Sequence, residues 1–448
     1  MTKYLFTTLL SNDLGLLTRS LPIATELAKR EHEIVFCSPG PAPSKLIADA
    51  GFANVLPRHP IYHLMAMDIS LRSFYRFIRA EPFKETYGTL LNFLRQLLPS
   101  LPLKTSPITA EIWNIDHISA MTGMLNKNFV RSLSLSLMDL MAELAIDAVV
   151  DFWNPMACIA ARAMHIPLFT VIQADMHPDS RGFIWWKPAP SDIPSPVPAI
   201  NKVLAELSLD PIHNTGELCV GDQTLVVGIH ETDPLPEGSD VTYIGPILWQ
   251  KEAIELPAWF DDLSRERPVI WVYSGNPNYL PRLRSPVDSA VVLRACIAAL
   301  AERDMQVVLT TGYHALPKDC LPLPPNFRYA SYVPGLAMAE RSDLLIHHGG
   351  YGSCQTGLYT GTPAVIIPTF SERESNARRV AQVGAGELLL PDEGVAWKKH
   401  VRAEALRAKV DKVLSNPAYA ENARRIQEKL RAYGGAPEAA RLIEEKAS

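Results

Sequence analysis

The chain has 448 residues, of which 47% are hydrophobic and 20% charged, so it is long enough for two or three domains and too apolar to be disordered. Its formal net charge is −5 and no long basic run occurs, which argues against a nucleic-acid partner. The six cysteines are scattered without a CxxC pair, which predicts reduced thiols rather than a zinc site or a disulfide framework.

The N-terminal apolar run ends at residues 11–13, Ser-Asn-Asp, too early for a secretory signal, so residues 4–10 are expected to form a buried strand. No uncharged apolar stretch of ~18 residues occurs, and we therefore expect no membrane span. The scattered cysteines, read as reduced thiols, predict a cytoplasmic location.

The first half of the chain alternates between apolar runs of strand length and segments with helical spacing, the pattern of a parallel sheet with helical crossovers. Residues 61–145 are apolar but helical in pattern, and we expect added helices over the carboxyl edge of the sheet, walling an acceptor pocket. The expected strands are residues 33–37, 148–152 and 167–173, with a helix at residues 20–30.

A segment rich in Pro, Gly and acids follows residue 228, and the alternation of strands and helices then begins again. The expected strands are residues 269–275, 305–312, 344–350 and 363–368, with helices at residues 287–303 and 402–446. The fold class predicted is α/β, with two tandem doubly wound, Rossmann-like domains facing each other across a cleft. The predicted divisions are residues 1–235 (acceptor domain), 236–262 (linker), 263–430 (donor domain) and 431–448 (terminal helix).

The strongest local motif is residues 343–386, which read as a buried strand, a glycine turn, a helix, a second strand and a second helix. Gly349, Gly350 and Gly352 would let a ligand approach the backbone closely, and Ser353 could cap the helix that follows. The free N–H groups at that helix start form an anion site, and His348 could donate a hydrogen bond there. A diphosphate suits such a site, although glycine turns after strands also occur without a ligand.

The segments HHGGYGS, GTPAVIIP and PTFSERESNARRV resemble, in this order, the donor-binding signature of the UDP-glycosyltransferase-like (GT1) enzymes, which have the GT-B fold, in their bacterial macrolide and natural-product form. This resemblance implies an inverting glycosyltransferase that moves a hexose from a nucleotide-diphosphate sugar, expected to be a UDP-sugar, to a hydroxyl of a small lipophilic acceptor. It implies no metal ion and no cofactor besides the nucleotide sugar, which is a co-substrate.

The resemblance also implies which residues bind the donor: Gly275, Asn276, Tyr332, Val333, His348, Gly350, Gly352, Ser353, Glu372 and Arg373. Two positions depart from the family. Arg373 replaces a glutamine amide, and because a guanidinium only donates, it could meet a carboxylate on the sugar or turn to solvent. Gly335 replaces another glutamine beside the base-binding segment.

The largest departure concerns the catalytic base, because Leu16 stands where the family has its histidine. Asp13 in the same loop and Asp151 at a strand end are the candidate bases. Either carboxylate could instead serve structure, as a turn cap or an acceptor of backbone N–H groups. Asp175 and His177 are weaker candidates.

A protein that binds nucleotide sugar or aglycone without catalysis is the alternative. Leu16 is expected to line the acceptor pocket together with Trp185 and Trp186, although this tryptophan pair would also suit a core or a domain interface.

Overall fold

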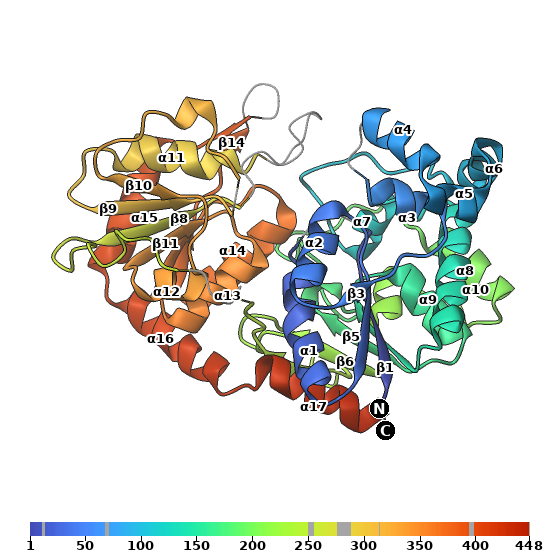
Figure 1. Cartoon of the computed structure of the whole chain (residues 1–448). Helices are drawn as coiled ribbons and strands as arrows, with labels where there is room; N and C mark the ends of the chain where they lie inside the picture. The colour runs from blue at the N-terminus through green and yellow to red at the C-terminus, as the bar shows by residue number, and fades with distance from the viewer. Residues whose placement is uncertain are drawn as a thin grey trace.

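The computed structural model describes residues 1–10, 14–67, 71–249, 255–275, 288–312, 314–393 and 398–447. Figure 1 shows two lobes side by side, each built on a twisted sheet with helices on both faces. Both large sheets are parallel throughout, so the predicted pair of doubly wound α/β domains is confirmed.

The first sheet has seven strands in the order β3-β2-β1-β4-β5-β6-β7. The order reverses between β1 and β4, where Thr7 lies opposite Asp151, and ligands of such sheets bind outside the carboxyl ends at this switch point. The strands are β1 (Lys3–Thr8), β2 (Glu33–Cys37), β3 (Ala53–Asn54), β4 (Ala148–Phe152), β5 (Leu168–Ile172), β6 (Gln223–Val227) and β7 (Thr242–Gly245).

Ten α-helices are described in the first lobe, and the expected helical insertion falls into six of them, α3 to α8. They are α1 (Leu17–Lys29), α2 (Pro41–Asp49), α3 (Pro60–Met65), α4 (Leu71–Arg79), α5 (Glu81–Tyr87), α6 (Leu90–Ser100), α7 (Ile115–Met121), α8 (Lys127–Leu144), α9 (Pro155–Ala163) and α10 (Val197–Glu206).

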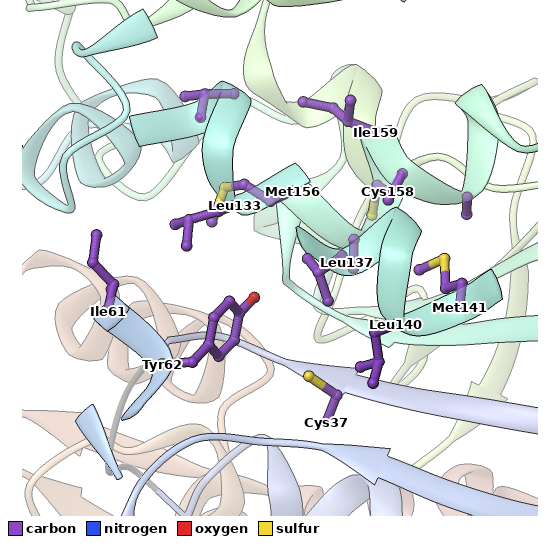
Figure 2. Packing of buried hydrophobic residues seen from close by; sticks show 14 of the residues in the cluster. Cys37, Ile61, Tyr62, Leu133, Leu137, Leu140, Met141, Met156, Cys158 and Ile159 are labelled. Atoms are coloured by element: carbon purple, nitrogen blue, oxygen red, sulfur yellow. The ribbon is translucent and has the colours of Figure 1, made fainter. Parts of the chain in front are cut away.

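Helix α8 covers one face of this sheet because its apolar residues recur every three or four positions. Leu133, Leu137 and Leu140 lie on its inner side and are buried. Figure 2 shows them near Cys37 of β2 and Tyr62 of α3, with the thiol and ring inside an apolar cluster. The cysteines in the described residues are all buried and unbridged.

The second sheet has six strands in the order β10-β9-β8-β11-β12-β13, with its switch point between β8 and β11. Its strands are β8 (Val269–Tyr273), β9 (Gln306–Thr310), β10 (Phe327–Ala330), β11 (Leu344–His347), β12 (Ala364–Ile366) and β13 (Gly386–Leu388), and a separate pair is formed by β14 (Asp392–Glu393) and β15 (Lys399–His400). Its helices are α11 (Ala290–Leu300), α12 (Gly335–Glu340), α13 (Tyr351–Thr360), α14 (Ser371–Gln382), α15 (Ala403–Ser415) and α16 (Ala418–Arg431).

The last helix, α17 (Gly435–Ala447), packs against α1 of the first lobe. Figure 1 shows it passing below the first sheet, so that both ends of the chain lie together. Glu444 accepts from Arg30 at 2.9 Å and lies 2.9 Å from His32, which gives that histidine a structural role.

Strand β7 extends the first sheet into residues 236–262, which were predicted to be a linker between the domains. The division into domains stays a proposal.

None of the helices in the described ranges is both long and apolar enough to cross a membrane.

Candidate functional site

The site predicted to hold a diphosphate lies at the switch point of the second sheet, where β8 and β11 end. Gly275 follows β8 with a φ of +66°, and a Cβ there would lie 3.0 Å from the imidazole of His348. A Cβ on Gly350 would lie 2.5 Å from the His348 Nε2 atom, closer than real contacts allow. The absence of side chains at both glycines therefore makes room for this histidine.

Helix α13 begins inside the glycine turn, with Gly350 as its N-cap and Tyr351 as its first residue. A Cβ on Gly352 would have no atom of the described chain within 4 Å, so the first turn faces open space. Unpaired N–H groups and the helix dipole make such a start attractive to anions. Ser353 lies within the first turn and is not the N-cap, so the expectation that it caps the helix is wrong.

Burial keeps the two histidines of the motif neutral. It holds the pKa of His348 well below its ordinary 6.5, and the nearby Arg373 charge adds to the effect. Burial also lowers the pKa of His347 to about 3. The His348 Nδ1 atom lies 3.5 Å from the Tyr273 carbonyl oxygen. A neutral imidazole has one N–H, which it can give either to that carbonyl or to a phosphate.

Glu372 and Arg373 occupy the first turn of α14, beside the glycine turn. Asn376, one turn later, donates to the Gly349 carbonyl at 3.0 Å and to Glu372 Oε1 at 2.8 Å. Burial raises the pKa of the Glu372 carboxyl, against the opposing effect of Arg373 and Asn376. Asn376 therefore holds this carboxylate next to the turn on which a donor would rest.

The guanidinium of Arg373 points along the sheet edge. Its Nη1 donates to Ser289 Oγ at 3.0 Å and to Thr369 Oγ1 at 2.7 Å, and its carbon lies 4.7 Å above the Phe370 ring. Ser289 is the N-cap of α11. These bonds show that the guanidinium is not turned to solvent, whereas a contact with a sugar carboxylate stays a prediction. The cation lies close to His348, on the side where the phosphates are expected.

A second cation comes from the first lobe. Arg19 of α1 lies with its guanidinium carbon 5.3 Å from the centroid of the Tyr351 ring, and its charge lowers the pKa of Glu372. Its Nε donates to the Gly15 carbonyl at 3.1 Å. Sequence reasoning placed Arg19 in the loop of the missing histidine but gave it no role. Only the packing of α1 against α13 shows the contact.

The candidate base Asp151 is fully buried. Its oxygens accept from Thr7 Oγ1 at 2.5 Å, from the Asn154 N–H at 3.0 Å and from Cys158 Sγ at 3.3 Å. Burial raises its pKa, although these hydrogen bonds oppose the shift. This geometry matches the structural alternative, in which the carboxylate ties the end of β4 to the start of α9.

Two further predicted donor residues lie after the end of β10, and two predicted residues fall outside the described chain. Tyr332 is half-buried and Val333 buried in the segment between β10 and α12, at the carboxyl edge of the second sheet. Asp13 and Asn276 fall outside the described residues.

The tryptophan pair lies at the domain interface, as one of the alternatives from the sequence held. Trp185 donates from Nε1 to Ser375 Oγ of α14 at 2.9 Å, and the Arg378 guanidinium carbon lies 4.3 Å above the Trp186 ring. Both rings pack on the donor helix, and their expected place in the wall of the acceptor pocket stays a prediction. Leu16, the N-cap of α1, is half-buried against two apolar clusters of the first lobe.

A buried ionic network joins the lobes behind the site. Arg379 of α14 pairs with Asp175 of the first lobe and lies 3.7 Å from Asp233 Oδ1. Ser375 donates to Asp175 Oδ2 at 3.1 Å. The Asp175 carboxylate is therefore engaged in contacts that hold the two lobes together and is not exposed to an acceptor. His177 is buried too, and burial lowers the pKa of its imidazole.

Gln355 is a further polar residue that sequence reasoning missed. It lies on α13, one turn after the glycine motif, and is 3% exposed. Its Oε1 atom has no hydrogen-bond partner within the described part of the chain. Buried amide oxygens are normally paired, so this acceptor is an exception within the described chain.

Comparison with known proteins relates part of the chain to glycosyltransferases. Residues 294–445 match the erythromycin biosynthesis protein CIII-like, C-terminal domain family. The chain is 29% identical over 229 residues to an uncharacterized UDP-glucosyltransferase, YojK, of Bacillus subtilis, covering 50% of this chain and 52% of that protein. It is 31% identical over 206 residues to 4'-demethylrebeccamycin synthase of Lentzea aerocolonigenes, covering 46% and 45%. The chain thus spans about half the length of the curated relatives it matches.

A solved structure extends the likeness to both lobes. Glycosyltransferase VinC in complex with dTDP superposes with a TM-score of 0.64 over 99% of each chain, at 18% sequence identity. The fold is therefore GT-B. Residues 294–445 therefore resemble the erythromycin biosynthesis protein CIII-like family in sequence, and the whole chain resembles glycosyltransferase VinC in fold.

The sequence match to the C-terminal domain family runs from within α11 to within α17 and includes the glycine turn and α14. The residues Leu16 and Arg373 depart from the family pattern. Leu16 belongs to the first lobe and Arg373 to the second. The first lobe supplies Arg19, and the second supplies the helix start that it faces.

Proposed function

We propose that the chain is an inverting glycosyltransferase that transfers a hexose from a UDP-sugar to a hydroxyl of a small lipophilic acceptor. The single observation that carries this proposal is the open start of α13 at the switch point, where Gly350 and Gly352 leave room for a ligand beside His348. A diphosphate fits this place because free N–H groups, a helix dipole and nearby cations would all favour its charge.

In the proposed reaction, the acceptor oxygen attacks the anomeric carbon, the bond from that carbon to the diphosphate oxygen breaks, and the hydroxyl proton passes to a base. The leaving diphosphate gains negative charge, which the start of α13 would stabilise most where water is excluded. Arg19 and Arg373 would add a positive charge from each lobe. Glu372, held by Asn376, would accept hydrogen bonds from sugar hydroxyls.

Asp13 remains the proposed base, since it belongs to the loop that normally carries the histidine. The buried position of Asp151 supports a structural role for that carboxylate instead. Burial raises its pKa, but a base also has to reach the proton that it abstracts. The acceptor is proposed to bind over the carboxyl edge of the first sheet, near Leu16 and the helical insertion. The cytoplasmic location stays a prediction.

The test is transfer by the purified protein. UDP-glucose, UDP-glucuronate, UDP-N-acetylglucosamine and dTDP-glucose are each offered with a panel of phenols and apolar alcohols, and nucleoside diphosphate and glycoside are both quantified. A new glycoside with inverted anomeric configuration, formed with an equal amount of nucleoside diphosphate, is the expected result.

Two other outcomes would replace the proposal. Tight UDP binding without glycoside from any pair would favour the alternative of a binding protein, with Leu16 as the reason. Retention of the anomeric configuration would exclude direct displacement. Preference for dTDP-glucose would change the nucleotide but keep the reaction.

A further inference from the structure

One region of the first lobe exposes an unusual share of apolar side chains. Twelve large hydrophobic side chains are exposed in the described residues, and six of them lie between residues 75 and 108, a small part of the chain. They are Tyr75 (50% exposed), Leu90 (42%), Leu91 (59%), Leu98 (59%), Leu103 (85%) and Ile108 (62%). Single exposed apolar residues are common, but such a concentration marks an interaction surface.

Helix α6 carries apolar residues on two sides. Phe93 and Leu97 face inward and are buried, while Leu91 and Leu98, seven positions apart, lie on an outer stripe. The inner residues already pack into the hydrophobic core, so the fold does not need apolar residues on the outer side of the helix. Arg95 lies on this outer stripe, four residues after Leu91, and is exposed.

Helix α4 lies beside α6, because aromatic rings join their inner sides. The Phe93 ring is 6.4 Å from Phe74 and 5.9 Å from Phe77, measured between centroids. On α4, Tyr75, Arg76 and Arg79 are exposed. In Figure 1, α4 lies at the top of the first lobe, and α5 and α6 lie at the outer edge of that lobe, away from the second lobe.

The segment after α6 is held in place, although its side chains are exposed. Asn126 accepts from the Lys104 N–H at 3.0 Å, and Ser106 is buried, with its N–H donating to the Ala120 carbonyl at 3.1 Å. Leu103 is therefore presented by a backbone that is held in place, whereas Ile108 lies near the second lobe, since the Ala110 carbonyl accepts from the Ser371 N–H at 3.0 Å. The other exposed side chains form what we call the α4–α6 surface: Tyr75, Arg76, Arg79, Leu90, Leu91, Arg95, Leu98, Leu103 and Lys104.

The charge of this surface is opposite to that of the whole chain. Residues 73–108 contain five basic and two acidic residues, whereas the chain has a formal net charge of −5. Both acids, Glu81 and Glu85, lie on α5, and Glu81 is paired with Lys84 at 2.6 Å. The arginines of α4 and α6 and Lys104 therefore interleave with the apolar side chains. This combination is complementary to a phospholipid surface, which offers phosphates above hydrocarbon.

We propose that the α4–α6 surface docks on an anionic phospholipid bilayer. The apolar side chains enter the interface, and the basic side chains pair with lipid phosphates. The helices lie on the bilayer and do not cross it, since α4 and α6 have 9 and 11 residues, far short of a span. The proposal concerns binding to lipid and is independent of any sugar transfer.

The experiment is co-sedimentation of the full chain with vesicles of phosphatidylcholine, or of phosphatidylcholine with phosphatidylglycerol, at low and high salt. Binding to the anionic vesicles that weakens with salt is expected. Leu91→Gln/Leu98→Gln should weaken it roughly tenfold, and Arg76→Gln/Arg95→Gln roughly fivefold for each charge removed. The matched control is Leu256→Gln/Leu390→Gln, which changes two leucines that are 41% and 49% exposed elsewhere and should bind as wild type.

All variants change exposed side chains, so unchanged thermal unfolding is expected and is measured alongside. Absence of binding to anionic vesicles, or equal loss in the control variant, would overturn the proposal. Concentration-dependent self-association that Leu91→Gln/Leu98→Gln abolishes would instead assign the surface to a second copy of the chain.

Discussion

Arg379 on the donor helix α14 is paired with Asp175 of the other lobe, and both side chains are more than nine-tenths buried. Asp233 lies on the far side of the same guanidinium, so one cation serves two carboxylates. Loss of this cation would leave two buried carboxylates without the guanidinium that neutralises them. The pair therefore fixes α14, with Glu372 and Arg373 at its start, against the first lobe.

We expect Arg379→Met to lower the free energy of unfolding by about 3–5 kcal/mol, because it leaves buried carboxylates unpaired. Adding Asp175→Asn should restore part of the loss, which urea unfolding of the two single variants and the double variant would show. Lys429→Met is the control. It removes an exposed ion pair with Glu231 between the lobes and should cost at most about 1 kcal/mol. Simple additivity of the two buried substitutions would contradict the coupling.

Asp233 gives a pH dependence with a definite sign. Burial raises the pKa of its carboxyl to about 6, from an ordinary value of 3.8. Between pH ~4 and ~6 the folded protein keeps a proton that the unfolded chain has released, so this group makes unfolding easier as the pH rises. Asp233→Asn should remove this contribution, and thermal unfolding of both proteins at several pH values measures the difference. Parallel curves would show that Asp233 does not titrate in this range.

Two glycines of the turn should separate ligand binding from folding. Gly352→Ala places a methyl group in open space, so we expect unchanged thermal stability and at least about tenfold weaker UDP binding by calorimetry, because the methyl group occupies the phosphate position. Gly350→Ala places its methyl group against His348 and should also cost about 1–3 kcal/mol of stability. Normal UDP affinity of Gly352→Ala would move the phosphates away from this helix start.

The two arginines are expected to recognise phosphate rather than sugar. Arg373→Gln and Arg19→Gln should each weaken UDP binding by about tenfold or more, while the affinity for uridine stays unchanged, because charge-assisted hydrogen bonds are lost only with the diphosphate. Arg373→Lys should recover part of the affinity. If Arg373→Gln changes only the preference among sugars, then the guanidinium faces the sugar.

The proposed base can be tested against its buried rival. Asp13→Asn should reduce kcat about 10²–10⁴-fold with little change in UDP affinity, which matches the usual contribution of a general base. Asp151→Asn should mainly lower thermal stability, since it disturbs the bonds to Thr7, Asn154 and Cys158. Wild-type turnover by Asp13→Asn would show that another group takes the proton.

The sequence predicts the two-sheet architecture well because buried parallel strands appear as short apolar runs closed by breakers. The run from Ala148 to Phe152 is predicted and observed over the same residues, and the helix expected at residues 20–30 spans Leu17–Lys29. Such signals are local, since they depend on the burial of both faces of one strand or one face of one helix.

The side-chain directions in the candidate site could not be predicted in this way. Arg373 bonds to Ser289, 84 residues away, and Arg379 pairs with Asp175, 204 residues away. Nothing in either segment indicates its partner, because the first contact arises when α14 packs near α11 and the second only when the two lobes pack. The cap assigned to Ser353 failed for a local reason. The chain becomes helical directly after Gly350, which has no side chain, so Ser353 falls within the first turn.

The return of α17 to the first lobe also limits how the lobes can move. The backbone passes between them once after β7 and once between α16 and α17, where Gly435 takes a φ of +58°. Two points at which the backbone crosses between the lobes define an axis for their relative rotation, whereas a single linker would allow rotation in any direction. Opening and closing are therefore expected as rotation about the line through these crossings, with twist and sliding suppressed.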